Sequence, residues 1–281
     1  MLIVELNHEE LLNEDVLADG FIIGVETLSS DCYQEYTLAE AFKIIKKIKQ
    51  LKKTVLIDCT NLFSDFELGK AFEKLKYLDQ DDDVDYFLYE DLGLMPYLKK
   101  EKRFFYSLTY NTNQYDLAIA LSENSKALMS PLLTLKEATT IANDNLFFIA
   151  FGTWRIFYSR RKLLTNYFNY RMQQFTEGDY QIIEETRPDE AYHIKEESGT
   201  KIYLHDYFYV NDELKYFANI ILKPFDLDYQ KTKEVINLYY QKINTKKGDL
   251  DQALTLLDIK HHQGLLFEDA ILIKKNKGVN A

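Results

Sequence analysis

The chain has 281 residues, 46% of them hydrophobic, and a formal net charge of −11. Its apolar runs are shorter than the roughly 20 residues that a membrane-spanning helix needs, and its acidic start, MLIVELNHEE, lacks the basic leader of a secretory signal. We therefore expect a cytoplasmic protein outside the membrane. Its net charge opposes contact with nucleic acid except at a local basic patch.

Apolar, β-prone runs recur at intervals that suit a strand followed by a helix. They begin at Phe21, Thr54, Val84, Phe104, Ala127 and Leu146. Between them, apolar residues at i, i+3, i+4 and i+7 predict helices over 38–51 and 68–78. With further strands over 2–6, 202–209 and 220–222, the number of strands comes close to that of a closed barrel.

Helix starts are marked by a hydroxyl residue followed three positions later by a glutamate, the pattern of a capping box. The pairs are Thr37 and Glu40, Ser64 and Glu67, and Thr134 and Glu137. Strand followed by capped helix, repeated, predicts parallel strands and an α/β fold. We expect one domain over residues 1–281, a single TIM-like (β/α) barrel, distorted in places, with a C-terminal extension. An open doubly wound sheet is the alternative.

The chain lacks the sequence patterns of several kinds of cofactor and metal site. The chain has neither a glycine-rich phosphate loop nor an HExxH pair, so we expect no bound cofactor and no metal. Its two cysteines, Cys32 and Cys59, have no partner at metal-ligand spacing. Cys59, at the end of TVLIDC, is the better placed of the two for a nucleophile, although a buried structural thiol is the more common role for such a residue.

Basic residues cluster in one segment. Four of the six arginines lie there together with a lysine: Arg155, Arg160, Arg161, Arg171 and Lys162. We expect these side chains to bind RNA through its phosphates, because guanidinium groups pair bidentately with phosphate oxygens. The alternative is that they pair with surface carboxylates, since the chain has 45 Asp and Glu residues.

Residues 146–171, LFFIAFGTWRIFYSRRKLLTNYFNYR, resemble the signature of the collagenase-like peptidase family U-32. With Gly152 on the first glycine of that signature, Arg155 and Lys162 occupy its two cysteine positions. The resemblance therefore implies that this chain lacks the iron-sulfur cluster of the cysteine-bearing members. Weaker matches to the family extend over most of the chain, at 90–93, 112–113, 188–200 and 262–274.

The same segment is most similar to the short paralogs of the family, which accompany longer, cysteine-bearing chains. This resemblance implies a non-catalytic or co-catalytic partner in 5-hydroxylation of the wobble uridine of tRNA, with tRNA and either a cysteine-bearing paralog or a second copy of the chain as partners. It assigns no catalytic residue here. The alternatives are a collagenase-like peptidase and a protein-binding scaffold with an aromatic surface over Tyr203–Tyr216.

Polar residues and one aromatic residue are expected where barrel strands end, which is where α/β barrels place their sites. These candidates for a pocket are Glu26, Asn61, Asp91, Thr109, Asn113 and Trp154. Carboxylates at such positions also cap helices, and packing at the barrel mouth is the alternative role for Trp154.

Overall fold

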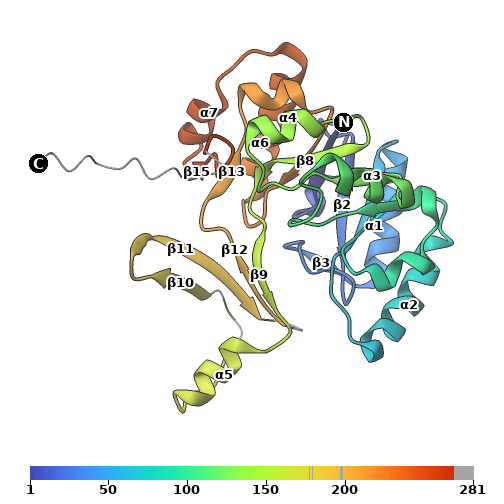
Figure 1. Cartoon of the computed structure of the whole chain (residues 1–281), viewed down its shortest axis with the longest axis vertical. Helices are drawn as coiled ribbons and strands as arrows, with labels where there is room; N and C mark the ends of the chain where they lie inside the picture. Colours follow the sequence, from blue (N-terminus) through green and yellow to red (C-terminus); the bar gives the residue numbers. More distant parts are fainter. Residues whose placement is uncertain (177, 179, 197–198, 269–281) are drawn as a thin grey trace, which may run out of the picture.

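The structure, a computed structural model, describes residues 1–176, 178, 180–196 and 199–268. Within them, eight parallel strands form a closed barrel (Figure 1), because β14 pairs with both β8 and β1. The barrel strands are β1 (Leu2–Glu5), β2 (Gly20–Val25), β4 (Thr54–Cys59), β5 (Tyr86–Tyr89), β6 (Arg103–Phe105), β7 (Lys126–Leu128), β8 (Leu146–Gly152) and β14 (Asn219–Lys223). The predicted TIM-like barrel is confirmed, and the open sheet is excluded.

Helices follow most of the barrel strands and cover the outside of the sheet, as in other β/α barrels. They are α1 (Leu38–Gln50), α2 (Asp65–Asp79), α3 (Gln114–Glu123), α4 (Leu135–Ile141), α6 (Tyr229–Thr245) and α7 (Leu250–Leu256). The three capping boxes predicted from the sequence start α1, α2 and α4. Strands enclosed on both faces are mostly apolar, and every residue of β8 is buried.

Two connections distort the barrel. A short 3-10 turn, η1 (Glu9–Leu11), joins β1 to β2, and two more, η2 (Leu92–Tyr97) and η3 (Lys100–Lys102), join β5 to β6. These turns stand where a regular barrel has an α-helix. Within the described residues, no helix is both long and apolar enough to cross a membrane.

A second, four-stranded antiparallel sheet is inserted after β8. We call residues 155–203 the arm; Figure 1 shows it extending away from α1–α3. Its elements are β9 (Arg155–Ser159), α5 (Leu163–Tyr170), β10 (Tyr180–Glu184), β11 (Arg187–Glu196) and β12 (Thr200–Tyr203), and its strand order is β10-β11-β12-β9. The sequence did not predict this sheet.

The expected strand over 202–209 is wrong as a barrel strand. Its first residues belong to β12 of the arm, and β13 (Tyr207–Tyr209) pairs antiparallel with β8. Two short strands complete the larger sheet, β3 (Glu35–Tyr36) beside β2 and β15 (His261–His262) beside β13, and η4 (Asp212–Tyr216) precedes β14. Of the match at 262–274, residues 269–274 lie outside the described residues.

The chain leaves the barrel at Gly152. This glycine has a φ of +131°, and a Cβ added to it would lie 2.1 Å from the backbone oxygen of Lys223. Only glycine accommodates both this backbone conformation and the close approach of β14. Gly152 therefore allows β8 to close the barrel and then to turn into the arm.

Candidate functional site

A network of charged and polar side chains fills the mouth of the barrel, where the carboxyl ends of the parallel strands meet. Five of its charged members come from the ends of β1 and β14, from the start of β9 and from the loops after β2 and β5: Glu5, Lys223, Arg155, Asp31 and Glu90. Tyr106, just after β6, joins them through Asp31. Residues far apart in the sequence thus meet at one end of the barrel.

Lys223 lies at the centre of this network. Its Nζ atom lies 2.8 Å from a carboxylate oxygen of Asp31 and 3.1 Å from one of Glu5, and it also donates a hydrogen bond to the backbone oxygen of Asp31 at 2.7 Å. The Tyr106 hydroxyl donates to Asp31 at 2.7 Å, and the Tyr33 amide donates to Glu5 at 2.7 Å. Glu5, Asp31 and Lys223 are each at most 3% exposed. Hydrogen bonds and ion pairs within the protein therefore replace the hydration of their charges.

The two carboxylates on Lys223 differ in acidity. Burial alone would raise the pKa of Asp31, but Lys223 and Arg155 outweigh burial and hold it below the usual value. At Glu5 burial prevails over Lys223, and its pKa is raised. Together the carboxylates raise the pKa of Lys223 well above its usual value, against the effect of burial. Lys223 therefore keeps its proton, and Glu5 accepts a proton more readily than Asp31.

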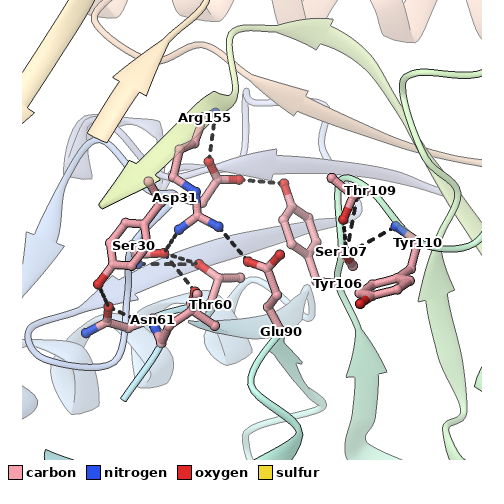
Figure 2. A network of polar contacts seen from close by, with 12 residues as sticks. Ser30, Asp31, Thr60, Asn61, Glu90, Tyr106, Ser107, Thr109, Tyr110 and Arg155 are labelled. Carbon is pink, nitrogen blue, oxygen red and sulfur yellow. Dashed lines mark hydrogen bonds and ion pairs between the residues drawn. The ribbon is translucent and has the colours of Figure 1, made fainter. Parts of the chain in front are cut away.

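Arg155 extends the network across the mouth (Figure 2). Its guanidinium donates to the Ser30 hydroxyl at 2.6 Å and to Glu90 at 2.5 Å, and its backbone amide donates to Asp31 at 3.2 Å. The ring of Tyr158 lies 5.0 Å from the guanidinium carbon. Arg155 is 8% exposed, so its guanidinium interacts with buried protein groups and is shielded from solvent.

One face of the arm covers the barrel mouth. Lys201 of β12, 2% exposed, lies 3.7 Å from Glu35, and the ammonium of Lys195 lies 3.7 Å from the ring centre of Tyr33. The ring of Tyr203 packs on Phe225, just after β14, at 4.8 Å between centres. The arm therefore closes the end of the barrel at which β/α-barrel enzymes bind their substrates.

The structure separates Arg155 from the other four basic residues expected to bind phosphate. Arg160, Arg161, Lys162 and Arg171 are all exposed on the arm, immediately before and after α5. Arg160 pairs with Glu67 of the α2 capping box at 3.2 Å, and both side chains remain about half exposed. An ion pair this exposed contributes little to stability.

Two of the six residues expected at a pocket lie at the mouth. The Asn61 amide donates to the backbone oxygen of Thr27 at 3.0 Å, and its side-chain oxygen accepts from the Tyr158 hydroxyl at 3.4 Å. Trp154 is buried, with its ring 5.1 Å from that of Phe208. Trp154 therefore packs at the base of the arm.

The other four follow β2, β5 and β6 at the same end of the barrel but are not among the charged residues named above. Asp91 starts η2 by accepting from the amide of Gly93, and Asn113 starts α3. Glu26 and Thr109 are exposed. Asn113 also borders an open groove of about 1150 Å³ between the starts of α3 and α4 and residues 266–268.

Sequence reasoning missed the centre of the network, namely Glu5, Asp31 and Lys223. A usable signal was present, because Glu5 ends the apolar strand LIVE and Lys223 ends IILK. A charged residue at the carboxyl end of a barrel strand points to the mouth.

The residues present do not fit an iron-sulfur cluster, which needs thiolate ligands. In the resemblance described above, Arg155 and Lys162 stand at the cysteine positions of the family signature. The thiols of Cys32 and Cys59 are buried, and burial raises the pKa of both well above the usual value. Within the described part of the chain, no three His, Cys, Asp or Glu side chains are grouped to hold a metal ion.

The fold and the mouth define a β/α-barrel protein with an inserted arm and a buried charge network at the barrel mouth. A sequence model of peptidase family U32 matches residues 15–227, well over half of the chain, and the chain belongs to this family.

Two solved structures match this chain. The U32 peptidase Mk0906 has 15% sequence identity and a TM-score of 0.49, over 79% of this chain and 91% of its own. A chitinase from Chromobacterium violaceum ATCC 12472 has 8% identity and a TM-score of 0.41, over 84% of this chain and 98% of its own. No curated protein sequence is significantly similar to this chain.

Proposed function

We propose that this U32 protein is a non-catalytic or co-catalytic partner in 5-hydroxylation of the wobble uridine of tRNA, acting in the cytoplasm beside a cysteine-bearing member of the family. One observation carries the proposal: Arg155, at a cysteine position of the signature, is held inside the barrel mouth by Glu90 and Ser30. A cationic group there cannot ligate iron, so the redox chemistry belongs to the partner.

In this proposal the arm contacts the tRNA backbone. Arg160, Arg161, Lys162 and Arg171 lie within twelve residues of one another and are all exposed, in a protein whose net charge is −11. Guanidinium groups bind phosphate oxygens bidentately, and Glu67, the carboxylate that pairs with Arg160, remains about half exposed. A phosphate can therefore replace Glu67 at little cost.

The two alternatives find less support. Peptide cleavage by cysteine needs an accessible thiolate, whereas Cys59 is fully buried and burial raises its pKa. An aromatic docking surface over Tyr203–Tyr216 needs exposed rings, yet Tyr203, Phe208 and Tyr209 are at most 7% exposed. Tyr216, at 47%, is the exposed aromatic residue at the end of that segment.

The proposal is tested by titrating tRNA with the Arg160→Ala/Arg161→Ala variant at two salt concentrations. We expect weaker binding, and a salt dependence whose slope falls by about one for each phosphate that the variant no longer binds. The matched control is Lys46→Ala/Lys47→Ala on α1, because Lys47 pairs with Glu9 as Arg160 pairs with Glu67 and is equally exposed. This control should bind like the native protein.

Unchanged affinity and slope in the arginine variant would remove the phosphate role. The same two variants, expressed in a strain that lacks the native gene, connect binding to modification. Nucleoside mass spectrometry should show hydroxylated wobble uridine restored by the lysine control and reduced with the arginine variant. Normal hydroxylation in the deletion strain itself would reject the proposed function.

A further inference from the structure

Helix α5 presents an apolar stripe to solvent. Leu163, Tyr167 and Tyr170 are spaced i, i+4 and i+7, so they share one face of the helix, and they are 36%, 57% and 84% exposed. None of the eight residues of α5 is buried. An ordinary surface helix does the opposite and turns its apolar stripe toward the core.

The opposite side of α5 is anchored to the arm, which fixes the direction of this stripe. The ring of Phe168 lies 5.4 Å from that of Tyr180 and 5.9 Å from that of Phe175. At the start of the helix, Glu196 accepts from the amides of Leu164 and Thr165 at 2.7 and 3.1 Å. These contacts fix the orientation of α5, so that Tyr167 and Tyr170 face solvent.

Cations flank the tyrosines at both ends of the helix. Arg160, Arg161 and Lys162 precede α5, and Arg171 follows it. A protein partner with an apolar surface would match the stripe but would leave four cations at its rim to be compensated. Single-stranded nucleic acid matches both features, because its phosphates pair with the cations and its bases stack on exposed aromatic rings.

We infer that α5 is a stacking platform for unpaired bases of RNA, with Tyr167 and Tyr170 against the bases and the flanking cations on the phosphates. This inference rests on the proposed function and narrows its ligand to an RNA loop in preference to a duplex. In a duplex the base faces are stacked on one another and are closed to the tyrosines.

The test compares two RNA probes with equal numbers of phosphates, a hairpin with an unpaired loop containing 2-aminopurine and a fully paired duplex. We expect Tyr167→Ala/Tyr170→Ala to weaken hairpin binding by roughly 5- to 100-fold. Duplex binding and the salt slope should stay unchanged, because no charge is removed. The native protein should quench the 2-aminopurine fluorescence, and the alanine variant should lose that quenching.

Two controls separate stacking from other effects. Tyr167→Phe/Tyr170→Phe keeps the rings and should keep hairpin affinity and quenching. Tyr115→Ala on α3 removes a tyrosine that is as exposed as Tyr170, 84%, and should change nothing. Since α5 buries no residue, the melting temperature of the alanine variant should match that of the native protein.

The outcomes distinguish this inference from the proposed function. If the alanine variant binds the hairpin normally, or loses hairpin and duplex alike, stacking is wrong, while weaker binding by the Arg160→Ala/Arg161→Ala variant still supports phosphate contact. A native protein that binds neither probe rejects both. Loss of a co-purifying protein with RNA binding intact would assign the stripe to a protein interface and overturn the inference.

Discussion

At the level of single residues, the mouth network places three buried charges within a few ångströms of one another. Removing water from these groups costs several kcal/mol per ion, and their mutual attraction offsets much of that cost. Lys223 has two carboxylate partners, whereas Asp31 has Lys223, the Tyr106 hydroxyl and the Arg155 amide. Lys223 is thus the cation that both buried carboxylates share.

Replacing Lys223 by Met should lower the free energy of unfolding by about 3–5 kcal/mol, because Glu5 would lose its cation and Asp31 would keep only the more distant charge of Arg155. The measurement is urea denaturation followed by the fluorescence of Trp154, which lies at the base of the arm. Lys242→Met is the matched control. Lys242 is also buried, but its partner Asp212 is exposed to water, so its loss should cost less.

Adding Glu5→Gln and Asp31→Asn to the Lys223→Met variant should restore most of that stability, since no charge then remains unpaired at this point. A triple variant no more stable than the single variant would show that the penalty arises from packing and not from charge.

The sequence predicted that Asn61 and Trp154 lie near the mouth, because both follow recognisable strands. It did not predict the charge network, since Glu5 and Lys223 are 218 positions apart. Their pairing depends on β14 closing the barrel beside β1. A local pattern marks the end of a strand, but it does not say which other strand lies next to it.

At the level of elements, the features marked by residues close together in the sequence were predicted correctly. The features that depend on residues far apart in the sequence were not. Each capping box sits within four consecutive residues, and all three were found where predicted. Helix α5 has no side-chain cap at Lys162, and its first turn is satisfied by Glu196 and Thr200, more than 30 residues away. The arm sheet was missed for the same reason, because its strands are defined by their pairing.

Replacing Glu196 by Ala should fray α5, because the amides of Leu164 and Thr165 and the Thr165 hydroxyl lose their common acceptor. The cost should resemble that of losing a helix cap, about 1–2 kcal/mol of local stability. Hydrogen exchange at these two amides measures it. Glu185→Ala, at an exposed position in the same arm, is the control and should leave both amides protected.

The hydrogen bonds to Glu196 should also make α5 sensitive to acid. Burial would raise the pKa of Glu196, but hydrogen bonds from Thr165 and Leu164 outweigh burial and lower it. A carboxyl group with a lowered folded-state pKa stabilises the fold fully above its usual value, near 4.5, and loses that contribution as the pH falls through the folded value. Protection of the two amides should therefore decline below about pH 4.5 in the native protein and stay low at every pH in Glu196→Ala.

At the level of the whole molecule, the barrel is closed across the arm. Strands β1 to β8 precede the arm in the sequence, and β14 follows it and fills the remaining gap between β8 and β1. The spacing of apolar runs predicted this barrel because each strand and helix unit leaves its own local pattern. It placed one strand wrongly, at 202–209, since an apolar run does not reveal which sheet it joins.

This order of strands predicts how the protein responds to a single cut in the arm. A recognition sequence for a specific protease, inserted after the exposed Arg171, would divide the chain into residues 1–171 and 172–281. The two pieces should co-elute on size exclusion in native buffer and separate in denaturant, because β14 from the second piece pairs with β1 and β8 of the first, and Lys223 pairs with Glu5 and Asp31. Trp154 fluorescence should match that of the uncut insertion variant, which is the control. Separation in native buffer would mean that β14 does not close the barrel.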